Sequence, residues 1–168
     1  YRLAPAYFIE KTGTKFKATL GTGFKSPSLY QLYAPATVWG PIGNKELKPE
    51  KGEGWEAGIE QLLFLEKLRL GATYFYNTYE DLIIFDFLQG YTNIGKAESK
   101  GVEIFSEARP TKEFLFRASY TRMEARDKEK DVYLLRRPRD KFAANLNWIF
   151  LQKWAANVSC LYIGKRDD

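Results

Sequence analysis

Apolar side chains recur at every second position along most of the chain. Between Leu68 and Asn77 the even positions are apolar or Tyr, and residues 114–122, 141–150 and 154–162 repeat the pattern. A period of two is typical of β-strands, whose successive side chains point to opposite faces. The pattern predicts an all-β protein with eight strands, at about residues 2–10, 14–24, 52–63, 67–87, 90–109, 113–126, 138–150 and 153–165. One short helix is predicted from Ser26 to Tyr33, with Ser26 as the N-cap and Pro27 in the first turn.

The connections between these strands alternate between short and long. Residues 11–14, 64–67, 109–113 and 151–153 form short turns, whereas residues 25–51, 81–91 and 125–137 form long connections. This alternation is expected of an antiparallel up-and-down meander whose two ends face different compartments. Outer-membrane β-barrels have this asymmetry, with short periplasmic turns and long external loops.

The two faces of the predicted strands also fit a barrel wall. One face is apolar, and the other carries mostly Gly, Ser, Thr, Asn, Arg and Glu, as expected beside a wet lumen. Aromatic residues make up 16% of the chain and cluster near strand ends, where a membrane girdle is expected. The residues predicted to face lipid or form the girdle are Trp55, Tyr74, Tyr76, Phe114, Phe116, Trp148, Phe150 and Trp154.

Three charged residues conflict with full immersion of the fifth predicted strand. Lys96, Glu98 and Lys100 share the parity of Val102 and Ile104, so they would lie on the lipid-facing side. A charge at the centre of the bilayer costs about 2–4 kcal/mol. Because only ~9–11 residues of a strand cross the membrane, we expect these charges to stand above it in water.

Composition argues against an enzyme. The chain has no His and a single Cys, Cys160, so it lacks the commonest general base and any internal disulfide. Glu50, Glu53, Glu56 and Glu60 do not share one face of a strand and are interpreted as solvated or luminal. The net charge of +5 permits nucleic-acid binding, but a surface of mixed charge is favoured, and no nucleic-acid partner is predicted. A soluble antiparallel β-sandwich or barrel that binds a ligand or carbohydrate is the alternative reading.

Five segments, in order, resemble the barrel of TonB-dependent outer-membrane receptors, with the cobalamin (vitamin B12) receptor group as the nearest resemblance. They are "GTGFKSPSLYQLYAP", "GNKELKPEKGEGWEAGIE", "YFYNTYEDLIIF", "YTNIGKAESKGVEIF" and "LLRRPRDKF", and together they span nearly the whole chain. The resemblance implies a barrel of about 22 strands with a plugged lumen. Residues 1–168 would be a partial barrel domain without the plug and the C-terminal strands.

The resemblance also implies a function in transport. The parent protein would sit in the bacterial outer membrane, in contact with its lipid, and take up a bulky, scarce nutrient such as a corrinoid, a siderophore or another metal chelate. The TonB complex would drive uptake by acting on the plug. No cofactor is implied. An isolated piece of the barrel would have free strand edges, through which it is expected to self-associate.

Candidate binding residues lie in the long connections. Aromatic side chains there would offer apolar walls to a large ligand, and these are Tyr30, Tyr33, Trp39, Phe85, Phe87 and Tyr91. Asp81 and Asp86 are weak candidates for a Ca²⁺ site, because Ca²⁺ takes several oxygen ligands; ordinary loop acids are the favoured reading. Arg136, Arg137 and Arg139 are predicted to lie in an external loop or the lumen.

Overall fold

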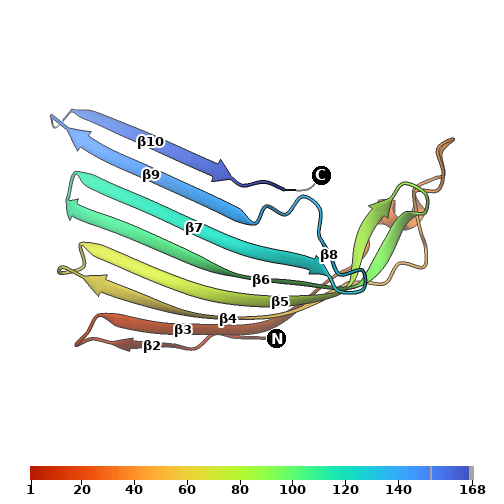
Figure 1. The fold of residues 1–168 in the computed structure, drawn as a ribbon, viewed down its shortest axis with the longest axis horizontal. Helices are drawn as coiled ribbons and strands as arrows, with labels where there is room; N and C mark the ends of the chain where they lie inside the picture. Colours follow the sequence, from red (N-terminus) through yellow and green to blue (C-terminus); the bar gives the residue numbers. More distant parts are fainter. Residues whose placement is uncertain (152, 167–168) are drawn as a thin grey trace.

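A single antiparallel sheet makes up nearly all of the structure, a computed structural model that describes residues 1–151 and 153–166. The described residues form ten strands, of which eight follow one another in the order β1-β3-β4-β5-β6-β7-β9-β10, while β2 pairs with β3 and β8 with β7. Figure 1 shows the strands side by side in a curved sheet. The strands are β1 (Arg2–Leu3), β2 (Ala6–Ile9), β3 (Thr14–Lys25), β4 (Glu50–Leu63), β5 (Leu68–Asp86), β6 (Gly90–Thr111), β7 (Phe114–Asp127), β8 (Val132–Tyr133), β9 (Asp140–Phe150) and β10 (Trp154–Ile163).

The predicted meander is confirmed, with one predicted strand divided in two. The first predicted strand splits into β1 and β2 around Pro5, yet Leu3 pairs with Leu20 and Ala6 with Lys17 in one continuous register. Proline has no N–H to donate to the ladder, which is why it interrupts pairing at the edge of a sheet. The short strand β8 was not predicted; it adds two residue pairs to the outer end of β7.

The predicted helix exists but begins later than expected. Helix α1 spans Leu29–Tyr33, and its N-cap is Ser28 rather than Ser26. The Ser28 hydroxyl accepts a hydrogen bond from the Gln31 backbone N–H, and the Gln31 side chain accepts one from the Ser28 N–H. This reciprocal capping box satisfies two otherwise unpaired donors. Ser26 could not form one, because the residue three positions later is Leu29, which has no side-chain acceptor.

The strand register places the apolar positions of every long strand on one face. A single row of cross-strand neighbours runs through Phe16, Ile59, Ala72, Ile104, Tyr120, Phe142 and Tyr162. The adjacent row on the opposite face runs through Lys15, Glu60, Gly71, Phe105, Ser119, Ala143 and Leu161. We call these the apolar face and the polar face. A slip of one residue in any strand would exchange them.

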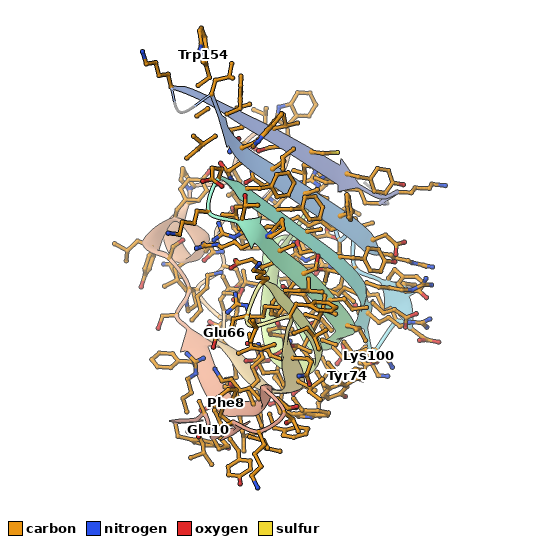
Figure 2. The ribbon with its side chains drawn as sticks, turned by 90° about the vertical axis from the view of Figure 1, so that its left-hand side faces the viewer. Phe8, Glu10, Glu66, Tyr74, Lys100 and Trp154 are labelled. Carbon is orange, nitrogen blue, oxygen red and sulfur yellow. The ribbon has the colours of Figure 1, made fainter. Side chains whose placement is uncertain are left out.

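The apolar face is not covered by a second layer of the described chain. Trp55 is 43% exposed, Ile104 50% and Val158 60%. Figure 2 shows side chains leaving both sides of the sheet, with Phe8 and Trp154 at its opposite edges. A soluble sandwich would hide the apolar face against another sheet, so the structure gives the soluble alternative no support.

The two ends of the sheet differ as the connection lengths predict. Short turns lie together at one end, and the long connections lie at the other, where the outer ends of β5 and β6 bend away from the sheet together with α1 (Figure 1). The bend coincides with Asp81, whose φ is +55° and which has no cross-strand partner between the Glu80–Lys96 and Leu82–Ile94 pairs. In the described part of the chain, no helix has the length and apolarity needed to traverse a membrane.

Candidate functional site

The long connection between β3 and β4 is built around helix α1. After the helix, the chain returns alongside it: the Gly43 N–H donates to the Ala34 carbonyl, and the Asn44 N–H donates to the Gln31 carbonyl. Gly43 suits this close approach because a Cβ there would lie 2.6 Å from the Ala34 nitrogen. The connection is therefore a compact folded loop.

This loop is joined to the outer part of the β5–β6 hairpin. The Tyr91 N–H donates to the Ile42 carbonyl at 2.9 Å, and the Asn44 side-chain amide donates to the Tyr91 carbonyl at 3.0 Å. Asn93 accepts from the Lys48 N–H at 2.9 Å and donates to the Lys48 carbonyl at 3.1 Å. Residues 26–49 and 82–94 thus form one packed assembly, which we call the external unit.

The external unit brings together most of the aromatic residues proposed from sequence as ligand contacts. Phe85 lies between Phe87 and Tyr91, with ring centroids 5.6 and 5.2 Å away. Tyr30 meets Tyr91 edge to face at 6.3 Å. Three of these rings therefore come from the hairpin and one from helix α1. Their pairing gives a semi-rigid aromatic surface, since such contacts add about 0.5–1.5 kcal/mol to the effect of buried area.

Tyr33 and Trp39 lie apart from those ring pairs. The Lys45 ammonium sits 5.7 Å from the Tyr33 ring centroid, which places a cation at the margin of the external unit. Trp39 is 89% exposed, and Phe87 is 86% exposed. Large side chains this exposed are available to contact a ligand or neighbouring loops, and they stay candidates for ligand binding.

The two acidic candidates for Ca²⁺ have other roles in the hairpin. Asp86 accepts from the Leu88 and Gln89 N–H groups and so shapes the turn. Asp81 contributes its backbone carbonyl to the Asn93 side chain. Among residues 1–151 and 153–166, no group of three His, Cys, Asp or Glu side chains is arranged to hold a metal ion. The Ca²⁺ prediction stays an expectation without a ligand set.

The apolar face carries an aromatic group on β4 and the middle of β5, outward of the row that contains Ile59 and Ala72. The Trp55 ring lies 5.5 Å from the Tyr74 ring and 6.3 Å from the Tyr76 ring. At the short-turn end, Trp148 and Phe150 form a second ring pair 5.1 Å apart, and Phe150 is the cross-strand neighbour of Trp154. Phe114 is the neighbour of Trp148, and Phe116 lies next on the same face of β7. The predicted girdle residues therefore share one face, at its two ends.

Two of the charges that conflicted with immersion, Lys96 and Glu98, lie outward of the outer aromatic group, and the third, Lys100, is the direct cross-strand neighbour of Tyr76. Glu98 accepts a hydrogen bond from the Tyr76 hydroxyl at 3.1 Å, and it lies 3.7 Å from the Lys100 and 3.3 Å from the Lys128 ammonium. Figure 2 labels Tyr74 and Lys100 close together on one side of the sheet. Desolvation opposes ionisation of Glu98, but the hydrogen bonds from Lys128 and Tyr76 outweigh it and lower the pKa of this carboxyl. Glu98 and Lys100 thus pair with each other at the outer edge of the apolar face, and Lys96 pairs with Glu80.

The polar face holds an ion network that the sequence analysis did not identify. Glu107 of β6 accepts from the Arg117 guanidinium at 2.7 Å, and Arg69 and Arg109 lie 3.9 and 4.0 Å from the same carboxylate. Nearby, Lys17 is 2.9 Å from Glu60. These residues stand at non-apolar positions of the period-two pattern, but only the strand register shows which of them meet.

Uncharged amides and hydroxyls occupy the same face of β9 and β10. Asn145 donates to the Ser159 hydroxyl at 2.8 Å, and Asn147 and Asn157 are linked to each other and to Asn145 through their side-chain amides. This row lies toward the short-turn end, like the Glu107 network. The polar face therefore has a charged part on β3 to β7 and a neutral hydrogen-bonding part on β9 and β10.

The arginine-rich segment before β9 lies at the outer end of the sheet. Arg126 and Arg139 place their guanidinium carbons 4.3 and 3.8 Å from the Tyr133 ring centroid. Arg126 also donates to the Tyr133 hydroxyl and to Asp131. The long β7–β9 connection is thereby tied to the end of β7, which agrees with the predicted position of Arg136, Arg137 and Arg139 outside the band.

Comparison with known proteins gives one family and a consistent set of solved structures. The family model described as "TonB dependent receptor-like, beta-barrel" matches residues 1–168. The copper transporter OprC is 19% identical, with 99% of this chain and 27% of that chain covered and a TM-score of 0.78. The siderophore receptor PirA from Pseudomonas aeruginosa is 21% identical, with 97% and 30% covered and a TM-score of 0.77.

A third similar structure is the ferripyoverdine receptor of the outer membrane of Pseudomonas aeruginosa. It is 20% identical, with 98% of this chain and 22% of that chain covered and a TM-score of 0.73. The chain thus spans less than a third of each of these structures, and their low identities bear on the fold alone. These names concern copper and siderophores and do not single out the cobalamin group. Since the family model covers the whole chain, residues 1–168 belong to the TonB-dependent receptor β-barrel family.

Proposed function

We propose that this chain is part of the barrel of an outer-membrane active transporter that imports a bulky, scarce nutrient with energy from the TonB complex. The observation that carries the proposal is the strand register. It holds one apolar row from Phe16 on β3 to Tyr162 on β10, while these side chains stay uncovered. In a transporter barrel, lipid covers that face and the polar face lines the lumen.

The external unit is the proposed ligand-binding surface. Its aromatic side chains Tyr30, Phe85, Phe87 and Tyr91 form ring contacts, and Lys45 adds a positive charge beside Tyr33. Apolar walls with a few polar or charged groups suit a large ligand that carries both kinds of surface. A metal chelate has this character. The similar structures named for siderophores and copper support this class, and a corrinoid remains a candidate through the sequence motifs.

Uptake by the full-length receptor that contains this chain tests the proposal. Cells that express it should accumulate a radiolabelled chelate only when TonB is present, and the protein should be extracted from outer membranes by detergent. Recovery in the soluble fraction, or uptake that is indifferent to TonB, would contradict the proposal.

A paired substitution tests the binding surface separately. Replacing Phe85 and Phe87 with Ala should weaken chelate binding by about tenfold, because each removes an aromatic contact of about 0.5–1.5 kcal/mol. Phe64→Ala is the matched control, since Phe64 is also exposed, at 74% against 86% for Phe87, but lies in a short turn at the other end of the sheet. Equal effects of the two changes would place the binding surface elsewhere.

A further inference from the structure

The short turn between β4 and β5 combines an unusual backbone with exposed apolar side chains. Phe64, Leu65 and Glu66 have φ values of +54°, +57° and +67°, in the left-handed region that side chains other than Asn and Asp rarely allow. Phe64 is 74% exposed and Leu65 95%. The turn is closed by a hydrogen bond of 3.3 Å from the Lys67 N–H to the Phe64 carbonyl. We call residues 64–67 the apolar turn.

Two other short turns of the sheet are built differently. In the β2–β3 turn the left-handed position is taken by Gly13, with φ +65°, and the polar residues Lys11 and Thr12 precede it. In the β6–β7 turn the residues between the strands are Lys112 and Glu113. A tight connection in this sheet can thus be made from polar residues and glycine. The apolar composition of the β4–β5 turn therefore has a reason other than chain reversal.

The apolar turn lies at the inner edge of the apolar band. Trp55 belongs to the aromatic group on β4 and β5, and Leu63, the last residue of β4, follows it by eight residues. At a rise of ~3.4 Å per residue and a strand tilt of about 40° from the membrane normal, eight residues span roughly 21 Å of depth. The apolar band of an outer-membrane barrel is ~25 Å tall. The tip of the turn, beyond Leu63, therefore reaches the boundary between acyl chains and headgroups.

Apolar residues connect the turn with the apolar face. Leu63 and Leu68 form the last residue pair of β4 and β5, and both stand at apolar-face positions of their strands. Figure 2 looks onto this end of the sheet, where Glu66 marks the apolar turn. Leu151 repeats the combination in the β9–β10 turn, with φ +51° and 79% exposure, directly after Phe150 of the second aromatic group. The exposed apolar side chains of both turns thus continue the apolar face at its short-turn end.

We infer that the apolar turn is an interfacial anchor, which inserts Phe64 and Leu65 into the periplasmic leaflet at the boundary between phospholipid acyl chains and headgroups. The inference rests on the proposed function, because it takes the apolar face as the surface that meets lipid. Transfer of two exposed apolar side chains from water to acyl chains is favourable, and it offsets the cost of three successive left-handed residues. Glu66 and Lys67 stay in the headgroup region, beside the inserted apolar tip. The turn thus fixes the depth of β4 and β5 in the bilayer.

Depth-dependent fluorescence quenching in the full-length receptor tests this inference. An NBD fluorophore is attached to Leu65→Cys in a receptor whose other cysteines, including the exposed Cys160, are replaced with Ser. In phosphatidylcholine vesicles, phospholipids that carry a nitroxide close to the headgroup should quench the label. Iodide in the water should quench it about threefold less than it quenches a label on Lys112→Cys. Lys112 is the matched control, because it lies in the polar β6–β7 turn at the same end of the sheet.

A double variant separates an anchor from a turn that only reverses the chain. Phe64→Asn combined with Leu65→Gly introduces residues that accept left-handed conformations at less cost, so a turn without lipid contact would be stabilised. An anchor loses its lipid contact, and the ratio of folded to unfolded receptor in vesicles should fall about tenfold. Equilibrium unfolding by urea measures this ratio. Lys112→Asn combined with Glu113→Gly is the control and should lower the ratio much less.

The inference fails if iodide quenches the label at position 65 as strongly as the label at position 112. It also fails if the label at position 65 is shielded from iodide but not quenched by the nitroxide lipids, since a protein segment would then cover the turn. A ratio of folded to unfolded receptor that rises in the double variant at positions 64 and 65 would likewise contradict it. Each of these results can occur while TonB-dependent uptake and outer-membrane location are intact, so it is distinguishable from failure of the proposed function.

Discussion

The external unit and the strands below it differ in what surrounds their apolar side chains. Among the described residues, the buried apolar side chains are Leu47, Ile94, Ala97 and Ala125, and all four lie at the outer end of the molecule. The strands below have paired backbones, but their apolar face is open from Phe16 to Tyr162.

The difference indicates two sources of stability. The external unit is stabilised by contacts within the chain, because its loop and hairpin bury residues against each other. The wall below is held by backbone hydrogen bonds between neighbouring strands, but no second layer of the described residues covers its apolar face. Substitutions in the external unit should therefore have local effects on stability. The effect of a substitution in the wall should depend on which face carries the altered side chain.

The largest effect is expected from a charge placed on the apolar face. Ala118→Arg on β7 should destabilise the full-length receptor by about 2–4 kcal/mol, because Ala118 lies near the middle of the apolar band. Ser119→Arg is the matched control on the adjacent polar face and should cost much less. Unfolding by denaturant in lipid vesicles measures both. Equal losses would mean that the two faces do not have different surroundings.

A bulky residue at Gly90 should separate the loop of the external unit from its hairpin. Gly90 has φ +76°, and a Cβ there would lie 2.6 Å from the Ile42 carbonyl oxygen. Gly90→Val should weaken packing of the loop on the hairpin by roughly 1–3 kcal/mol and reduce chelate affinity, while leaving the wall intact. Hydrogen exchange of residues 41–48 measures the loss. Gly23→Val is the control, since a Cβ at Gly23 meets nothing within 4 Å; if both variants behave alike, the contact with Ile42 is unimportant.

A smaller effect in the same unit is expected from loss of the Asn93 side chain. Asn93→Ala removes its hydrogen bonds to the Lys48 backbone and to the Asp81 carbonyl. The free energy needed to open the loop should fall by roughly 1–2 kcal/mol, because backbone groups lose their hydrogen-bond partners. Asn77→Ala on β5, whose amide has only a 3.5 Å contact to Ser99, is the comparison. Unchanged exchange at Lys48 in Asn93→Ala would show that this link is dispensable.

The smallest effect is expected from acid at the boundary between the two regions. The folded-state pKa of Glu98 is lowered, so its stabilising contribution is complete above the unfolded-state pKa and is lost as the pH falls through the folded-state pKa. The contribution should be about 1 kcal/mol or less, because Lys100 and Lys128 are half exposed. Glu98→Gln should remove this part of the pH dependence. If Glu98→Gln retains the full pH dependence of stability, that dependence arises from other carboxylates.

The wall could be predicted from sequence because a period-two pattern directly reports the alternation of faces. The predicted strand 67–87 became Leu68–Asp86, and 113–126 became Phe114–Asp127. The pattern also placed Trp55, Tyr74 and Tyr76 on one face, as the register confirms. Long strands repeat the signal many times, so the three misfits Lys96, Glu98 and Lys100 do not obscure it.

The interactions that depend on local geometry or on register could not be predicted in this way. Whether Ser26 or Ser28 is the N-cap depends on where a helix of little more than one turn begins. The bend at Asp81 depends on the positive φ of that one residue. The ion network of Glu107, Arg69 and Arg117 joins residues from three strands, and spacing along one strand carries no information about neighbours on another. The aromatic candidates of the two long connections were predicted separately, without the hydrogen bonds that join them.

Accessibility along β10 in the full-length receptor is the most direct test of the claim that one face meets lipid and the other water. Spin labels are placed one at a time at Ala156, Asn157, Val158, Ser159 and Cys160, and their environment should alternate between lipid and water. Those at the even positions should be relaxed mainly by oxygen dissolved in lipid, and those at the odd positions mainly by a water-soluble nickel chelate. Uniform exposure along the strand, or alternation with the opposite phase, would contradict the account.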